Sequence, residues 1–181
     1  MADTIKLHDL EFVPYLSEQE LAEVVSRLAD TINQKFSGKT PLFVVVLNGA
    51  FIFASDILKM VNLDCEVSFL RVSSYRGTAS TGEVKEMMPI GTDVRDRDVV
   101  LIEDIVDTGR TMGEVKSQML SEGANSVSIC TLLYKPEAFQ GDYLVDFIGF
   151  EIPNRFVVGY GLDYDGLGRN LPSLYQIKPK I

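Results

Sequence analysis

The stretch VVLIEDIVDTGRTM, Val99–Met112, decides the fold of this 181-residue chain. Its four opening residues are aliphatic, which predicts a strand over residues 98–103. Three acids mark the end of that strand: Glu103, Asp104 and Asp107. A Thr-Gly-Arg-Thr turn follows and leads into a helix predicted over 110–122. The order of strand, acidic turn and helix is typical of an α/β protein.

The rest of the chain repeats this alternation. Ser17 and Glu20 have capping-box spacing, so a helix is predicted to begin after Ser17. Further strands are predicted over 42–49, 64–75, 126–135, 144–150 and 156–160, and a further helix over 50–61. These elements predict a mainly parallel sheet with helices on both faces, and a ligand bound beyond the carboxyl ends of its strands.

The acidic turn has the chemistry of a sugar-phosphate site. Gly109 lets the backbone approach a ligand closely, and Thr108 and Thr111 add hydroxyl donors. The first N–H groups of the following helix suit a phosphate. Ionised carboxylates only accept hydrogen bonds, and sugar hydroxyls donate them, so the acids fit a sugar better than an isolated anion. The alternative is an acidic loop whose charges are merely solvated; it does not explain the order of acids, Gly and Thr.

Composition narrows the class of protein. The net charge of −9 disfavours nucleic-acid binding and predicts that a bound polyphosphate is neutralised by helix N–H groups and a divalent cation. The apolar runs are too short to cross a membrane, and the first residues do not resemble a secretory signal. Cys65 and Cys130 are predicted to be buried free thiols. We therefore expect a cytosolic protein that does not act on a membrane.

Several segments together resemble one family. VLIEDIVDTGRTM resembles the phosphoribosyl-pyrophosphate motif of the type I phosphoribosyltransferases. SSYRGTASTG (73–82), LLYKPEA (132–138) and FEIPNRFVVGYGLDY (150–164) extend the resemblance, and the last points to the hypoxanthine-guanine branch. The resemblance implies one domain over 1–181, with a base-binding hood from the two terminal segments and a mobile lid at about 76–91. A loop that long in a compact domain is usually functional.

The resemblance implies transfer of the phosphoribosyl group from phosphoribosyl pyrophosphate to a 6-oxopurine base, with Mg²⁺. Glu103 and Asp104 would bind the ribose hydroxyls and metal, and Asp107 would handle the proton at N7 of the base. The 5-phosphate would lie against Asp107, Thr108, Gly109, Arg110 and Thr111. Hypoxanthine, and guanine as well, would give IMP and GMP.

The same resemblance assigns the base and pyrophosphate contacts. Lys135 would donate to O6, with Phe156 stacked on the purine and Val157 and Asp163 beside it; Asp163 would also help to hold the metal through water. Asn48, Gly49, Ser74, Tyr75 and Arg169 would contact pyrophosphate. The residue types alone allow other interpretations: Lys135 could extend into solvent, Phe156 could be ordinary core, and Arg169 could be a surface residue.

One departure and two alternatives stay open. Asn48 stands where the family usually has Lys or Arg, in a loop that the family associates with a cis peptide and backbone contacts to pyrophosphate. A transferase of the same fold could act on xanthine, adenine or a pyrimidine instead, although Lys135 suits a 6-oxo group better than a 6-amino group. A nucleotide sensor that binds RNA or DNA would need a basic face. Because members of the family are commonly dimers or tetramers, the resemblance implies a homo-oligomer.

Overall fold

A computed structural model of the chain describes residues 3–73, 86–87 and 92–179. Six strands form the central sheet in the order β5-β4-β3-β6-β7-β8. All neighbours are parallel except β5, which is antiparallel to β4. The strands are β3 (Leu42–Leu47), β4 (Glu66–Ser73), β5 (Glu86–Met87), β6 (Asp98–Val106), β7 (Ser126–Tyr134) and β8 (Phe147–Glu151). The prediction of a mainly parallel α/β sheet is confirmed.

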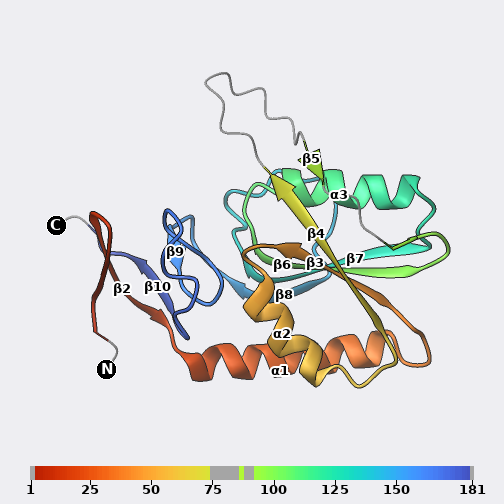
Figure 1. The fold of residues 1–181 in the computed structure, drawn as a ribbon, viewed down its shortest axis with the longest axis horizontal. Helices are drawn as coiled ribbons and strands as arrows, with labels where there is room; N and C mark the ends of the chain where they lie inside the picture. Colours follow the sequence, from red (N-terminus) through yellow and green to blue (C-terminus); the bar gives the residue numbers. More distant parts are fainter. Residues whose placement is uncertain (1–2, 74–85, 88–91, 180–181) are drawn as a thin grey trace.

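Helices cover both faces of this sheet. α1 (Glu18–Lys35) and α2 (Phe51–Met60) pack on one face, and α3 (Arg110–Ser121) lies on the other (Figure 1). The capping box at the start of α1 is confirmed, since Ser17 and Glu20 bond each other's backbone N–H groups. Among the described residues, no helix is both long and apolar enough to cross a bilayer.

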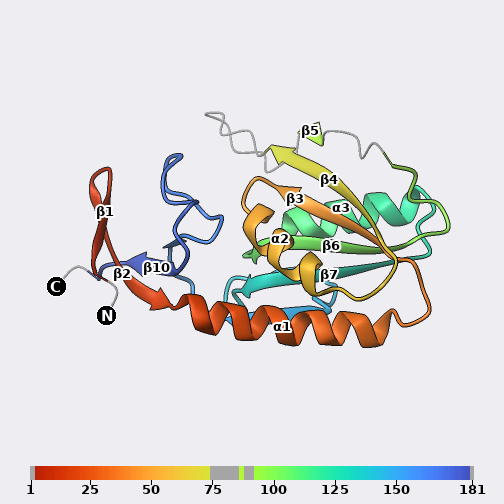
Figure 2. The same cartoon turned by 60° about the horizontal axis from the view of Figure 1, so that its bottom comes forward.

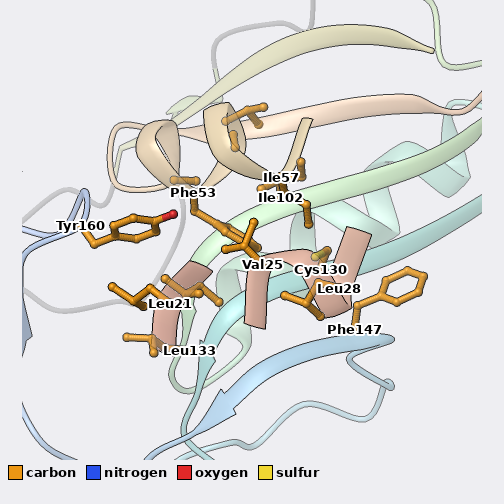
Figure 3. Packing of buried hydrophobic residues seen from close by; sticks show 14 of the residues in the cluster. Leu21, Val25, Leu28, Phe53, Ile57, Ile102, Cys130, Leu133, Phe147 and Tyr160 are labelled. Atoms are coloured by element: carbon orange, nitrogen blue, oxygen red, sulfur yellow. The ribbon is translucent and has the colours of Figure 1, made fainter. Parts of the chain in front are cut away.

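The hydrophobic core explains why the inner strands read as continuous apolar runs. On β3, Val45 packs toward α1 and α2, whereas its neighbour Val44 packs toward α3. Because both faces are covered, successive residues of a strand are buried alternately on opposite sides. Figure 3 shows the hydrophobic cluster on the α1 and α2 side of the sheet, in which side chains of these helices meet those of β6, β7 and β8.

A second, four-stranded sheet is built from the two ends of the chain. Its order is β1-β2-β10-β9, with β1 (Ile5–Leu7), β2 (Leu10–Leu16), β9 (Val157–Val158) and β10 (Leu174–Ile177), all antiparallel. Phe12, Val158 and Tyr175 form its own small core. Figure 2 shows the arrowheads of β6 and β7 directed toward this sheet, so it stands at the carboxyl ends of the central strands.

Several predicted boundaries were wrong. β6 does not stop at residue 103 but continues to Val106, because Ile105 and Val106 still pair with β7. Glu103 and Asp104 therefore lie within the strand instead of following it. β4 begins at Glu66 and not at residue 64, and the predicted residues 74–75 lie outside the described part. Cys65, in the loop before β4, is a free thiol that is only partly buried; Cys130 is free and buried as predicted.

Asp98, the first residue of β6, connects three segments of the core. Its carboxylate accepts hydrogen bonds from Ser126 and Asn125, and Lys39 Nζ lies 2.9 Å away. These bonds, that from Ser126 above all, lower the pKa of Asp98 from 3.8 to about 2. Because the pKa is lower in the folded state, the stabilisation is complete above pH 4 and is lost as the pH falls toward 2.

Asp98→Asn is therefore expected to lower the free energy of unfolding by about 2 kcal/mol at pH 7. The difference from wild type should shrink as urea titrations are repeated from pH 4 down to pH 2. Asp30→Asn, on the exposed side of α1, serves as the control and should change little. A difference that is the same at pH 2.5 and pH 7 would show that the ionised carboxylate is not what stabilises this junction.

Candidate active site

A cavity of about 400 Å³ opens between the carboxyl ends of the central strands and the small sheet. Residues far apart in the sequence meet there. Among those predicted as site residues, the cavity is lined by Gly49, Glu103, Asp104, Asp107, Thr111, Lys135, Phe156, Val157, Asp163 and Arg169. The sequence motifs are thus brought together in one place, on the edge of the sheet where ligands of parallel α/β proteins bind.

The Thr-Gly-Arg-Thr turn encloses a second, smaller pocket of about 100 Å³ next to the first. Asp107, Thr108, Gly109 and Thr111 line it. Gly109 is the N-cap of α3, with φ +80°, and no side chain caps the helix. The first N–H groups of α3 are therefore available to a ligand, as an anion site at a helix N-terminus requires.

Glu103 and Asp104 sit side by side in β6 with little compensation for their charge. β6 pairs with β3 only as far as Ile102, so the two acids lie at the floor of the cavity. Glu103 Oε2 is buried and has no hydrogen-bond partner among the described residues. Desolvation, and then the neighbouring Asp104, raise the pKa of Glu103 well above its ordinary value; desolvation also raises the pKa of Asp104.

This acid pair fits a divalent cation that arrives with a substrate. Within the described ranges, no three His, Cys, Asp or Glu side chains are grouped so that they could hold a metal by themselves. Mg²⁺ usually takes only one or two carboxylates and completes its shell with water and substrate phosphates. An unpartnered, desolvated carboxylate oxygen is the kind of ligand that such an ion, or a sugar hydroxyl, would satisfy.

The raised pKa of Glu103 predicts a pH-dependent effect of Glu103→Gln. Because the folded pKa exceeds the unfolded value, wild-type stability falls as the pH rises above about 4.5 through the folded pKa. Gln does not titrate, and its amide can donate to Asp104. Relative to wild type, the variant should have a higher free energy of unfolding at pH 8 and nearly the same one at pH 5.

Urea titrations at the two pH values would measure this, with the exposed Glu137→Gln as the control for loss of a negative charge. If Glu103→Gln is less stable than wild type at pH 8, the carboxylate is not destabilising.

Lys135 and Asp107 form a donor–acceptor pair in which the lysine is buried and the aspartate is partly exposed. They follow β7 and β6, whose final residues Tyr134 and Val106 are in register, so the parallel pairing brings the two side chains together. Lys135 Nζ lies 2.7 Å from Asp107 Oδ2 and 3.4 Å from Asn154 Oδ1. Only 7% of Lys135 is exposed, so it does not extend into solvent. An ammonium donor and a carboxylate acceptor thus stand next to each other at the cavity wall.

Phe156 presents an aromatic ring to the cavity. It is 45% exposed although it lies next to the buried Val157 of β9. Its ring packs edge-on against Tyr164, with centroids 5.8 Å apart, and near Phe12 at 6.2 Å. The small sheet therefore fixes the ring while leaving part of it free, which suits stacking on a flat ligand better than burial in the core.

Arg169 is a cavity residue and not a surface one. It lies 2.6 Å from Asp163 Oδ1 and donates to the Gly161 carbonyl, and Asp163 Oδ2 accepts the Gly166 N–H. Each carboxylate oxygen can accept a second bond, so Asp163 can still meet an ion through water. The Leu47–Asn48 peptide that precedes Gly49 is cis.

Other predicted residues are placed differently. The Asn48 side chain does not line the cavity, and Arg110 bonds Gln140 with its guanidinium instead of facing the cavity. Ser74 and Tyr75, with most of the predicted lid, lie outside the described residues. The sequence reasoning missed six cavity residues: Val46, Leu47, Val72, Ile105, Arg155 and Leu162. Five are aliphatic, and the sequence pattern does not distinguish them from core residues. Arg155 could have been predicted as a site residue, because it is a charged residue next to the aromatic Phe156.

Comparisons with known proteins agree with this geometry. A family model described as a phosphoribosyl transferase domain matches residues 14–165. A hypoxanthine-guanine phosphoribosyltransferase of Lactococcus lactis is 42% identical over 92% of this chain and 91% of its own. A bifunctional protein TilS/HprT of Listeria monocytogenes is 44% identical over 92% of this chain, which spans about a quarter (26%) of that protein.

A crystal structure of a hypoxanthine phosphoribosyltransferase from Staphylococcus aureus superposes with a TM-score of 0.87, covering 92% of this chain and 91% of that one at 38% identity. The sequence motifs, the fold and the residues of the cavity thus all indicate the same family. The chain belongs to the phosphoribosyltransferase family.

Proposed function

We propose that this protein transfers the 5-phosphoribosyl group of phosphoribosyl pyrophosphate to N9 of hypoxanthine, and also of guanine, to give IMP or GMP and pyrophosphate. The observation that carries the choice of base is the contact between Lys135 and Asp107. The names of the Lactococcus and Staphylococcus proteins support the same choice.

The two groups match one edge of a 6-oxopurine. O6 accepts a hydrogen bond, and the adjacent N7 carries a proton when N9 is free to attack. Lys135 can only donate and an ionised Asp107 can only accept, so together they complement that edge. A 6-aminopurine would turn an amino donor toward Lys135, leaving a buried ammonium facing another donor. Such a mismatch discriminates strongly against a 6-aminopurine, because the unpaired donors would stay buried without water.

The remaining site residues supply binding and orientation. Glu103 and Asp104 accept hydrogen bonds from the ribose hydroxyls, and the turn of residues 107–111 holds the 5-phosphate through the free N–H groups of α3. Phe156 stacks on the base beside Val157. Asp107 receives the N7 proton as N9 attacks C1 of the ribose. Arg169 and the backbone at Asn48 and Gly49 contact the leaving pyrophosphate, as do Ser74 and Tyr75 by prediction.

Magnesium would be held by Glu103 and Asp104, with Asp163 reaching it through water. When bound, the ion neutralises the phosphates and stabilises the departing pyrophosphate. This protein needs such a cation because its net charge is −9 and the acid pair has no basic partner within hydrogen-bond distance among the described residues. Adding EDTA should therefore abolish activity, and Mg²⁺ should restore it.

A panel of bases tests the proposal. The purified protein with Mg²⁺ and phosphoribosyl pyrophosphate would be given hypoxanthine, guanine, xanthine or adenine while pyrophosphate release is followed. We expect release with hypoxanthine and guanine, and kcat/KM for adenine at least about 100-fold lower. Lys135→Met should raise the KM for hypoxanthine and narrow that gap, whereas Lys39→Met, far from the cavity, should do neither. Preference for adenine, or no release with any base, would refute the assignment.

The small sheet is proposed as the base-binding hood, since it carries Phe156 and Val157. A single functional domain, a homo-oligomer and a cytosolic location stay predictions from the resemblance and the composition.

A further inference from the structure

The segment 139–143, Phe-Gln-Gly-Asp-Tyr, forms a wall behind the turn that is proposed to hold the 5-phosphate. Phe139 packs edge-on against Tyr143, with ring centroids 5.3 Å apart, and against Tyr134 at the same distance. A Cβ atom on Gly109 would lie 2.3 Å from Phe139 and 2.8 Å from the Tyr143 hydroxyl. The turn therefore rests directly on these aromatic rings, and Gly109 is required for this contact as well as for its positive φ.

Two donors of this wall bond two successive carbonyls of the turn. The backbone N–H of Gln140 donates to the Thr108 carbonyl at 3.0 Å. The Tyr143 hydroxyl donates to the Gly109 carbonyl. Burial raises the pKa of Tyr143 to about 12, so its hydroxyl keeps the proton that it donates. None of the wall's residues lines the small pocket that the turn encloses.

Because peptides are planar, the direction of each fixed carbonyl also determines the direction of the N–H group in the same peptide. In a trans peptide the C=O and the N–H point in opposite directions. Fixing the Thr108 carbonyl fixes the direction of the Gly109 N–H, and fixing the Gly109 carbonyl fixes that of the Arg110 N–H. The Arg110 N–H makes a long contact to Thr108 Oγ1 at 3.5 Å, which at that length is too weak to satisfy it. Among the described residues, the Gly109 N–H has no acceptor and the Arg110 N–H has only this long contact, and the planar peptides aim both away from the wall.

We propose that Tyr143 is a positioning residue for the phosphate subsite: its hydroxyl holds the Gly109 carbonyl from behind so that the turn's N–H groups converge on the 5-phosphate. The proposal rests on the proposed function, which places that phosphate at residues 107–111. Tyr143 does not line either pocket of the site and touches no substrate; it acts only through the Gly109–Arg110 peptide. This hydrogen bond joins two neutral groups, so it orients the turn without adding negative charge near the phosphate of an already acidic protein.

Tyr143→Phe removes this one hydrogen bond and keeps the ring. The Gly109 carbonyl still accepts the Gly113 N–H at 2.9 Å, so it is not left unpaired and the variant should fold. Titration calorimetry would compare the binding of IMP and of inosine, which lacks the phosphate. We expect IMP affinity to fall about 10-fold and inosine affinity to stay the same. The KM for phosphoribosyl pyrophosphate should rise by a similar factor, with the KM for hypoxanthine unchanged.

Tyr134→Phe is the matched control. It removes a hydroxyl from the same aromatic cluster, but from a residue that makes no hydrogen bond to the turn within the described part of the chain, and it should bind IMP like wild type. Equal IMP affinity in Tyr143→Phe and wild type would overturn the proposal, and so would an equal loss for IMP and inosine. Wild-type turnover of hypoxanthine, measured in parallel, tests the proposed function separately, since it does not depend on either variant.

Discussion

Asp107→Asn is expected to lower kcat with hypoxanthine by about 100-fold or more, because asparagine cannot accept the N7 proton as N9 attacks. The side chains are nearly the same size, so the cavity keeps its shape. The contact at 2.7 Å would become one between the Lys135 ammonium and a neutral amide, so Lys135 would lose its carboxylate partner at the wall of the cavity. Steady-state kinetics should show the loss in kcat, with the KM for phosphoribosyl pyrophosphate within a few-fold of wild type.

The pH profile separates a proton role from a structural one. If Asp107 accepts a proton, the acid limb of the wild-type kcat profile should be absent in the variant. Asp64→Asn, an exposed acid in the loop before β4, controls for the loss of one negative charge from a protein of net charge −9. Near-normal turnover by Asp107→Asn would remove Asp107 from the chemistry and leave it as a partner of Lys135 alone.

Gly49→Ala is expected to reduce kcat/KM for phosphoribosyl pyrophosphate by at least about 100-fold. The added Cβ would lie 1.5 Å from Asp104 Oδ2 and 2.5 Å from its Cγ, which is impossible without movement. Asp104 cannot yield cheaply, because its Oδ1 is bonded to the Ile105 N–H at 2.7 Å. The loop cannot retreat either, since Gly161 lies so close behind that a Cβ there would be 2.1 Å from the Gly49 carbonyl.

The Asp104 carboxylate, which is proposed to bind the ribose, must therefore leave its position, and overpacking should also cost about 1–3 kcal/mol of stability. Kinetics with varied phosphoribosyl pyrophosphate and thermal unfolding would measure the two effects separately. Gly38→Ala is the control: it adds the same methyl in open space, with φ +75°, and should lose some stability but no activity. If Gly49→Ala keeps wild-type kinetics, the close approach of Gly49 to Asp104 has no role in substrate binding.

The parts of the fold that were predictable are those whose patterns have a local cause. The buried strands could be found because both faces are covered, and α1 because Ser17 and Glu20 form a capping box. β1, β2 and β10 were not predicted. Pro14 lies within β2, where it would ordinarily argue against a strand, and it is tolerated at the shift in register between Leu174 and Tyr175 of β10. Pairing between the two ends of a chain has no local signature.

The site shows the same division. Glu103 and Asp107 could be identified because their residue types suit a definite chemistry, whereas Lys135 could be identified only through the family resemblance. The parallel register of β6 and β7 explains why Asp107 and Lys135 meet. Tyr143 could not be identified from the sequence, because an aromatic residue in a loop is usually interpreted as a packing residue. Only the structure shows that its hydroxyl donates to the Gly109 carbonyl. Arg110 belongs to the motif, yet its side chain turns toward Gln140 and only its backbone faces the turn.

The unpartnered oxygen of Glu103 also bears on how long the protein survives. Because this oxygen is buried with no donor among the described residues, the ligand-free form is less stable than a form in which a ligand donates to it. Any sugar phosphate that satisfies it adds resistance to heat and proteolysis, by about 2.7 kcal/mol when its free concentration is 100 times its Kd. The protein should therefore unfold at a higher temperature with such a ligand than without it.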